Sequence, residues 1–284
     1  MSNQYKNIKD KICKFILKDI EHSFFKEQLE YTIFDGKYLR SIITYSIGKN
    51  LYLSAAIEYI HNSSLLIDDM PFMDNDNIRR NKETLHKKYG ESTTLLTSYN
   101  LTLDAFKHIS SFYTESKFIN KNLIKLINIE INFEMNNLIK GQYLDLNNIN
   151  FNNEPPRVCS EKIINLINYK TGSLFYLGFF FGYISKYEIK QNEFDNICAI
   201  LRKIGYGFGL CFQILDDLED YNKPNENKLI NIKTYFNRKE LCKLYCENLD
   251  NFRNNAIDLN IYNDVLEYLY NYLIDKFKNL IGNF

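Results

Sequence analysis

The sequence predicts an all-α fold, and three observations lead to that prediction. The 284 residues include only 11 glycines and 4 prolines, so residues that interrupt helices are scarce. Apolar residues recur at intervals of three and four over long stretches, which is the period of an α-helix. No segment combines the strict alternation of a strand with flanking turn residues. Because no linker-like composition divides the chain, we expect a single domain over residues 1–284.

Helical periodicity recurs from the N-terminus to the C-terminus. The apolar stripe of a first amphipathic helix contains Ile8, Ile12, Phe15, Ile16 and Ile20. Further helical patterns cover residues 54–70, 122–146, 161–184, 194–220 and 263–281. We expect breaks at Asp35-Gly36, at Pro71, and in residues 147–156 and 221–231. The longest apolar run, residues 174–184, is too short to span a bilayer and predicts a buried helix.

Charge, the N-terminal stretch and cysteine content indicate which binding partners and which cell compartment to expect. Thirty-five basic residues balance 35 acidic ones, so we expect neither nucleic acid nor an anionic membrane surface as a partner. The N-terminal stretch fits neither a secretory signal nor a transit peptide, and we expect a cytoplasmic protein with no membrane span. Six scattered cysteines predict reduced thiols. Cys242 and Cys246 lie one helical turn apart, but no second pair accompanies them as a metal site would require.

Two acidic clusters indicate the chemistry. The first places four carboxylates within nine residues, directly after an apolar helical pattern: Asp68, Asp69, Asp74 and Asp76. The second follows another apolar stretch and consists of Asp216, Asp217 and Asp220, with Gln213 on the same helical face. Like charges at such spacings repel by roughly 0.2–0.5 kcal/mol per pair, and cations relieve that repulsion. Mg²⁺ prefers oxygen ligands and is usually bound by carboxylates together with substrate phosphates. The clusters therefore predict a metal–phosphate site with two facing sides.

Seven short motifs stand in the order found in the trans-polyprenyl diphosphate synthases. "DDMPFMD" (68–74) resembles the DDxxxxD form of that family's first aspartate-rich motif, and "FQILDDLED" (212–220) resembles its second, DDxxD. "GKYLR" (36–40) resembles GGKxxR, and "IHNSSLLIDD" (60–69) carries a histidine seven residues before the first aspartate. The remaining motifs are "GQYLDL" (141–146), "KTGSLF" (170–175) and "KTY" (233–235). The similarity covers roughly residues 31–235.

This resemblance implies an isoprenoid-synthase-type helical bundle around a central apolar cavity, usually in a homodimer. It implies head-to-tail condensation of isopentenyl diphosphate with an allylic diphosphate (dimethylallyl, geranyl or farnesyl). The leaving group is a diphosphate, so its departure needs charge neutralisation, which three Mg²⁺ ions per active site would supply. By resemblance, the metal ligands are Asp68, Asp69, Asp74, Asp216, Asp217 and Asp220. The resemblance does not assign Asp76 and Glu219 as metal ligands or exclude them.

The resemblance also divides the cations between two substrates. The residues that match the isopentenyl diphosphate pocket are Lys37, Arg40, His61 and Arg80. Those that match the allylic diphosphate side are Arg79, Lys170, Gln213 and Lys233. Lys170, Thr171 and Gln213 match catalytic positions; the oxygen dipoles of Thr171 and Gln213 would stabilise the allylic cation. Gln142 and Asp145 match a motif on the cavity wall.

Three departures from the family pattern stand out. Asp35 replaces the first glycine of GGKxxR and brings a carboxylate beside a phosphate pocket. Asn81 follows the two arginines where a glycine is usual. The loop after Asp220 is shorter and has no glycine, so its phosphate-binding lysine is left open between Lys223 and Lys228.

Residues before the first motif bear on product length. In the family, bulky side chains four or five positions before the first aspartate stop elongation early, and here those positions are Ser64 and Ser63. Both are small, so we expect geranylgeranyl diphosphate (C20). Three alternatives remain: a farnesyl diphosphate synthase (C15), a non-catalytic partner subunit of a prenyl synthase, and a terpene cyclase. Both aspartate motifs are intact, which disfavours the partner subunit, and the second motif lacks the hydroxyl residue of a cyclase.

Overall fold

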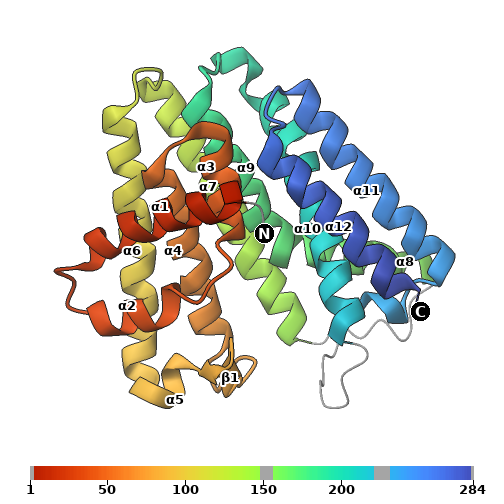
Figure 1. Ribbon diagram of the computed structural model, residues 1–284, viewed down its shortest axis with the longest axis horizontal. Coiled ribbons are helices and arrows are strands. Elements are labelled where there is room, and N and C mark those ends of the chain that lie inside the picture. Colours follow the sequence, from red (N-terminus) through yellow and green to blue (C-terminus); the bar gives the residue numbers. More distant parts are fainter. Residues whose placement is uncertain (1–2, 148–155, 221–230, 283–284) are drawn as a thin grey trace. The chain divides into compact units, whose positions relative to one another are not determined.

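The computed structural model of the chain describes residues 3–147, 156–220 and 231–282, and most of them are helical (Figure 1). This confirms the all-α prediction. Of the expected breaks at 147–156 and 221–231, residues 148–155 and 221–230, with Lys223 and Lys228 among them, lie outside the described residues. Contacts divide the chain into two compact parts, residues 1–124 with 181–189 (the first part) and residues 125–180 with 190–284 (the second part). Each part is described in turn.

The first part contains six helices preceding α7, a short hairpin, and the C-terminal end of α9. Its elements are α1 (Asn3–Ile20), α2 (Lys26–Ile33), α3 (Leu39–Gly48), α4 (Leu51–Asp68), β1 (Ile78–Arg79), β2 (Lys82–Glu83), α5 (Leu85–Tyr89) and α6 (Glu91–Glu115). The helix α4 is apolar on several faces, with buried residues around most of its surface, and it contacts α1, α2, α3 and α6. It corresponds to the helical pattern that the sequence shows over residues 54–70.

A partly buried ionic cluster ties α1 to α4 and α6. Tyr59 Oη donates to Asp19 Oδ2 at 2.9 Å, and His108 Nε2 lies 2.9 Å from the same oxygen. Lys107 Nζ donates to Asp19 Oδ1 at 3.0 Å. Burial alone would raise the pKa of Asp19, but the hydrogen bonds from His108, Lys107 and Tyr59 outweigh it and lower that pKa. The α1 stripe adds apolar contacts, since Ile8, Ile12, Ile16 and Ile20 are all buried.

The hairpin β1–β2 is a feature that the sequence did not indicate. Ile78 pairs with Glu83 and Arg79 with Lys82, which leaves Arg80 and Asn81 as a two-residue turn. Both turn residues have positive φ, 54° and 62°, as a type I′ turn requires. Asn tolerates this left-handed conformation, which explains why Asn81 can stand where glycine is usual. Two residues per strand are too few to produce a readable alternation.

The second part is built around one long helix. Its elements are α7 (Lys121–Leu146, from residue 125 on), α8 (Pro156–Ile167), the π-helical turn η2 (Asn168–Gly172), α9 (Ser173–Lys186, to residue 180), η3 (Gln191–Glu193), α10 (Phe194–Asp220), η4 (Ile232–Thr234), α11 (Arg238–Asp258) and α12 (Asp264–Ile281). The helix α10 contacts α8, η2, α11 and α12. Phe208 of α10 packs between Phe175 and Phe252, with ring centroids 4.9 and 5.1 Å away.

The predicted buried helix at residues 174–184 is confirmed. It forms most of α9, and Phe175, Phe179, Phe180 and Phe181 are each 0% exposed. Within the described chain, one segment, Gln191–Asp220, is long and apolar enough to cross a membrane by length and composition alone. Of its most apolar window 61% is buried, and the core helix of a soluble protein passes the same test.

The pKa of Asp19 generates a prediction about stability. Because folding lowers that pKa, the ionised side chain stabilises the folded state at pH values above its unfolded pKa of about 4. The contribution is lost as the pH falls from there toward the lower folded value. We expect Asp19→Asn to reduce the free energy of unfolding by roughly 1–3 kcal/mol at pH 7. Urea unfolding should show the difference shrinking below about pH 4; a difference that stays constant down to pH 2 would contradict this account.

Candidate active site

The first acidic cluster lies where α4 ends. The amide of Asp69 donates to the Leu65 carbonyl at 3.1 Å, and the chain then turns at Pro71. The amide of Asp74 donates to the Asp68 carbonyl at 2.9 Å, so the backbone doubles back. Asn75 completes the turn with a φ of 55°. The predicted break at Pro71 is therefore present, and the turn brings Asp74 back to Asp68.

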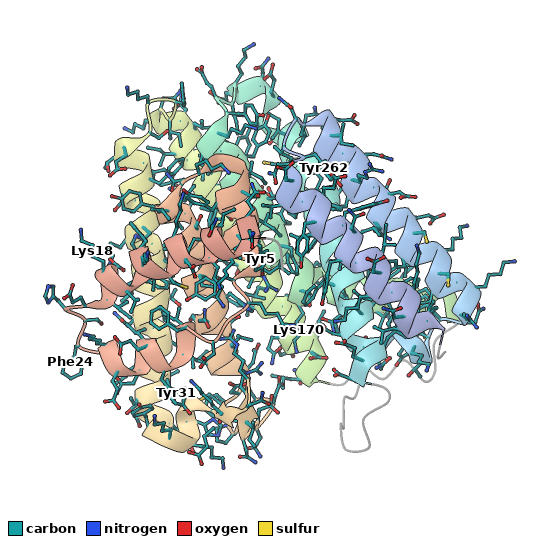
Figure 2. The ribbon with its side chains drawn as sticks, viewed as in Figure 1. Tyr5, Lys18, Phe24, Tyr31, Lys170 and Tyr262 are labelled. Atoms are coloured by element: carbon teal, nitrogen blue, oxygen red, sulfur yellow. The ribbon has the colours of Figure 1, made fainter. Side chains whose placement is uncertain are left out.

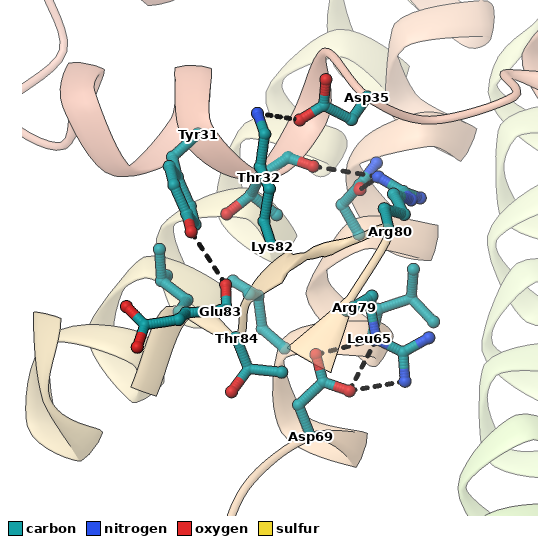
Figure 3. Close-up of a pocket in the computed structure, with 13 residues that line it drawn as sticks. Tyr31, Thr32, Asp35, Leu65, Asp69, Arg79, Arg80, Lys82, Glu83 and Thr84 are labelled. Carbon is teal, nitrogen blue, oxygen red and sulfur yellow. Dashed lines mark hydrogen bonds and ion pairs between the residues drawn. The ribbon is translucent and has the colours of Figure 1, made fainter. Parts of the chain in front are cut away.

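The Asp69 carboxylate is held by hydrogen bonds and an ion pair from Arg79. Arg79 Nε donates to both Asp69 oxygens, at 2.6 and 2.8 Å (Figure 3). Its Nη2 also lies 3.3 Å from Asp76 Oδ2. The Asp69 side chain is 3% exposed and the Arg79 side chain 32%, so the carboxylate is largely desolvated while the guanidinium keeps some contact with water. Burial alone would lower the pKa of Arg79, but the hydrogen bonds and charge of Asp69 outweigh it and raise that pKa. The residue predicted for the allylic diphosphate is thus held against a predicted metal ligand.

The GKYLR motif is a loop leading into α3. Lys37 is exposed and lies before the helix, which begins at Leu39, so Lys37 and Arg40 do not share a helical turn. The loop is fastened by α1: Tyr5 Oη donates to the Lys37 carbonyl and Lys9 Nζ to the Gly36 carbonyl, each at 2.7 Å. Figure 2 shows Tyr5 directed into the protein from α1. Tyr38 adopts a left-handed φ of 58°, an uncommon conformation for a bulky residue that tertiary contacts must maintain.

Arg40 and His61 meet between α3 and α4. Arg40 Nη1 lies 3.3 Å from His61 Nε2. Burial lowers the pKa of His61, and the charges of Arg40, Arg80 and Arg79 lower it further, so the imidazole is neutral at pH 7. A neutral imidazole next to the Arg40 guanidinium offers one acceptor and one donor. This pairing agrees with the prediction that both residues serve one pocket.

Arg80 is directed inward from the hairpin turn. Its Nη1 donates to the Thr32 carbonyl at 3.0 Å and to Asn62 Oδ1 at 3.4 Å. Arg79, Arg80, Asp69 and Asp35 line one pocket together with Tyr31, Thr32, Asn62, Leu65, Leu66, Lys82, Glu83, Thr84 and Leu85 (Figure 3). Asp35 forms an ion pair with Lys82 at this pocket. The carboxylate that departs from the family pattern therefore has a local cation that offsets its charge.

The second acidic cluster lies at the end of α10, where Asp217 organises its neighbours. Asp217 is 3% exposed and accepts from Gln213 Nε2 at 2.8 Å. Its Oδ2 accepts from the Ile232 amide at 3.0 Å, and its carbonyl accepts from Asn231 Nδ2 at 2.9 Å. Asn231 in turn caps η4 by accepting from the Lys233 amide at 2.9 Å. Asp217 therefore fastens the segment carrying Lys233 to α10.

Lys170 and Thr171 stand on a local distortion of the helix. The turn η2 (Asn168–Gly172) is π-helical, and such turns are rare and frequent at functional sites. Lys170 Nζ forms an ion pair with Asp145 of α7, and Thr171 Oγ1 donates to Gln213 Oε1 at 3.0 Å. A Cβ on Gly141 would stand 2.7 Å from Lys170 Cα, so glycine permits α7 to approach this turn. Lys170, Thr171, Gln213 and Asp145 are thus brought together.

Two charged residues, one beside the second acidic cluster and one in the middle of α4, were not identified from the sequence. Lys276 of α12 lies 2.9 Å from Glu219 Oε2, and its charge also interacts with Asp216. Glu58 of α4 is buried between Ser41 and Asn62. Glu58 has a sequence signal, because it is the only charged residue in the apolar stretch from Leu51 to Ile60. Lys276 has none, since 57 residues separate it from Glu219 and spacing does not predict such contacts.

The carboxylates fit Mg²⁺ by donor type, though they do not enclose an ion by themselves. Among the described residues, no three His, Cys, Asp or Glu side chains are grouped so that they could hold a metal. This includes Cys242 and Cys246. Mg²⁺ commonly retains waters and uses only one or two carboxylates along with substrate phosphates. The oxygen-only donor sets of the two clusters match that pattern.

Comparisons with known proteins identify the family. The pattern of the polyprenyl synthetase family matches residues 22–234. A farnesyl diphosphate synthase of Buchnera aphidicola is 34% identical over 220 residues, 73% of this chain and 75% of the relative. The chain belongs to the polyprenyl synthetase family. Its members named for their products include a geranylgeranyl diphosphate synthase of Pseudescherichia vulneris, 32% identical over 60% of this chain and 52% of that protein.

Solved structures agree on the fold of this polyprenyl synthetase. A geranyltransferase from Legionella pneumophila superposes with a TM-score of 0.73, 23% identity, and coverage of 99% of this chain and 95% of that one. A geranyltranstransferase from Thermotoga maritima gives a TM-score of 0.71 with 21% identity, covering 98% and 97% of the two chains. The protein is a prenyltransferase of isoprenoid biosynthesis. Relatives named as farnesyl and geranylgeranyl synthases both occur, so product length is open.

The Asp69–Arg79 pair yields a prediction for this prenyltransferase. We expect Asp69→Ala to lower the free energy of unfolding by on the order of 3 kcal/mol, because it removes the buried carboxylate partner of Arg79 and leaves only the exposed contact with Asp76. Arg79→Ala in the Asp69→Ala background should recover part of that loss. A double-mutant cycle from urea unfolding measures the coupling. If the losses of unfolding free energy in the two single variants simply add up in the double variant, the pairing of Asp69 with Arg79 is contradicted.

Proposed function

We propose that the enzyme condenses isopentenyl diphosphate with allylic diphosphates, head to tail, to a short-chain trans-prenyl diphosphate, with geranylgeranyl diphosphate (C20) as the product. The observation that carries the proposal is that both aspartate clusters are intact at the ends of apolar helices, each with cationic side chains beside it. Relatives named farnesyl and geranylgeranyl diphosphate synthases support the substrate class. The known primers of that class are dimethylallyl, geranyl and farnesyl diphosphate.

Magnesium is the proposed cofactor, with three ions per active site. Its candidate ligands are Asp68, Asp69 and Asp74 in one cluster and Asp216, Asp217 and Asp220 in the other. When bound, Mg²⁺ would neutralise the charge that develops on the departing diphosphate. Asp69 and Asp217 now accept hydrogen bonds from Arg79 and from the Ile232 amide. Their contribution as ligands therefore requires that these bonds be exchanged or shared.

The cations are proposed to bind the two diphosphates separately. Lys37, Arg40, His61 and Arg80 would receive isopentenyl diphosphate, and the meeting of Arg40 with neutral His61 supports their joint action. Guanidinium groups suit bidentate contacts with phosphate oxygens. An allylic diphosphate would bind Arg79, Lys170, Gln213 and Lys233. Burial lowers the pKa of Lys233.

Thr171 and Gln213 are proposed to stabilise the allylic cation. Their oxygens lie together, with Thr171 Oγ1 donating to Gln213 Oε1. Gln213 is also held by Asp217 through its Nε2, so its amide orientation is fixed from both ends. Fixed dipoles stabilise a developing charge without reorganising during the reaction. The chain thus supplies orientation and charge, and no side-chain base is needed where the released pyrophosphate removes the proton.

Two aspects of the assembly are proposed as well. Leu96, Tyr99, Leu103 and Phe106 form an exposed apolar stripe at spacings of three and four along α6. Such stripes mark interaction surfaces, and we propose that a second copy covers this one in a homodimer. Sedimentation velocity that finds only monomers at micromolar concentration would contradict the homodimer.

We also propose a cytoplasmic location, since six cysteines without disulfide bonds fit a reducing compartment.

One experiment tests the function. The purified protein is incubated with Mg²⁺, labelled isopentenyl diphosphate and each of the C5, C10 and C15 primers, and product length is measured. We expect elongation to C20, and chelation of Mg²⁺ should abolish it. A product that stops at C15 would favour farnesyl diphosphate, which the 34% identical Buchnera relative supports. No elongation from any primer would contradict the proposal and leave the partner-subunit alternative.

Product length has its own prediction at Ser63 and Ser64. Ser63 is buried against α6, with its Oγ 2.8 Å from both Ser98 Oγ and Thr102 Oγ1, and Ser64 Oγ donates to the His61 carbonyl. We expect Ser63→Tyr to shorten the product, because in the family a bulky side chain five positions before the first aspartate stops elongation early. Ser63→Ala is the matched control and should retain C20. Unchanged product length in Ser63→Tyr would contradict this role of Ser63.

A further inference from the structure

Glu58 is a buried carboxylate in the middle of α4, the helix that leads to the first acidic cluster. It is 1% exposed, and the α4 residues around it are apolar or small. A carboxylate in such surroundings is tolerated only where it is hydrogen-bonded and paired with positive charge. None of the seven motifs includes Glu58, and the proposed chemistry does not use it.

Both carboxylate oxygens of Glu58 accept hydrogen bonds from residues adjacent to proposed substrate-binding groups. Ser41 Oγ donates to Oε2, and Ser41 directly follows Arg40 in the chain. Asn62 Nδ2 donates to Oε1 at 3.2 Å and to the Glu58 carbonyl at 2.8 Å, and Asn62 directly follows His61. The carboxylate therefore connects α3 and α4 at the point where Arg40 meets His61.

Asn62 extends this connection to the hairpin. Its Oδ1 accepts from Arg80 Nη1 at 3.4 Å, and the same nitrogen donates to the Thr32 carbonyl. Glu58 Oε1 and Arg80 Nη2 also approach Gly36 together, since a Cβ at Gly36 would stand 3.2 and 3.3 Å from them. The carboxylate and the guanidinium thus converge at the motif residue that has no side chain.

The electrostatics agree with this geometry. Burial raises the pKa of Glu58, and the hydrogen bond from Ser41 and the charges of Arg80 and Arg40 oppose that rise. The same two arginines help to lower the pKa of His61, after burial itself. Glu58 therefore lies in the positive field of the arginines proposed to bind isopentenyl diphosphate.

We propose that Glu58 is a positioning residue that orients Arg80, through Asn62, and Arg40, through Ser41, for the diphosphate of isopentenyl diphosphate. The inference rests on the proposed function. Glu58 does not touch the substrate in this account; it holds the two guanidinium groups in place before the substrate arrives. Pre-ordered long side chains lose less freedom on binding, so the affinity for isopentenyl diphosphate depends on a residue outside its pocket.

Glu58→Gln tests the proposal, because it keeps the shape of the side chain and removes its charge. We expect the KM for isopentenyl diphosphate to rise about tenfold, the order of one lost charge-assisted hydrogen bond. The KM for the allylic primer should change less than about twofold, an effect too small to reflect a lost contact. Equilibrium binding of isopentenyl diphosphate should weaken in parallel. An unchanged or lower KM for isopentenyl diphosphate would overturn the proposal, since Glu58 would then only offset positive charge.

Two further variants separate positioning from stability. Asn62→Ala retains Glu58 but removes the link to Arg80, and it should show the same selective rise; it decides the question if Glu58→Gln does not fold. Asp19→Asn removes a partly buried acid of the first part whose hydrogen bonds are to Tyr59, Lys107 and His108, and it should lower stability while leaving both KM values unchanged. A wild-type protein that elongates no primer overturns the proposed function itself. Active wild type with unchanged constants in Glu58→Gln and Asn62→Ala overturns only the role of Glu58.

Discussion

Charge balance within the resting fold is the constraint on which this protein depends. Binding two diphosphates with metal ions requires many carboxylates and cations near the ends of apolar helices, where unpaired charges are costly. The described residues meet this requirement with internal pairs: Asp69 with Arg79, Asp145 with Lys170, Glu219 with Lys276, and Asp35 with Lys82. Each pair includes at least one residue of a family motif or its immediate neighbour. The site is thus stable before its ligands arrive, because the protein supplies the opposite charges.

The helical framework places these pairs through a few local departures from regular geometry. Tyr38 and Arg80 adopt left-handed backbone conformations next to predicted phosphate-binding residues. The π-helical turn at residues 168–172 carries Lys170 and Thr171. Such conformations persist only where surrounding contacts maintain them. Here Tyr5 and Lys9 fasten the loop at Tyr38, and the close approach at Gly141 supports the π-helical turn.

Sequence reasoning predicted the features that depend on local pattern. Apolar periodicity identified α4, α9 and α10, and the motifs identified both acidic clusters, because each signal lies within a few residues of chain. It missed features set by tertiary contact. The bond from Arg79 to Asp69 depends on a hairpin of two-residue strands, and the contact of Lys276 with Glu219 depends on how α12 packs against α10. The π-helical turn was missed because a one-residue shift in backbone hydrogen bonding leaves the apolar pattern unchanged.

The most direct test of this account is whether diphosphate binding requires metal. Isothermal titration of inorganic pyrophosphate into the protein would be performed with Mg²⁺ and with excess chelator. If the aspartates and cations are held by one another at rest, pyrophosphate should bind in Mg²⁺ and bind at least about tenfold more weakly without it. Equal affinity in both conditions would show that the cations are already available to the diphosphate, and would contradict the account.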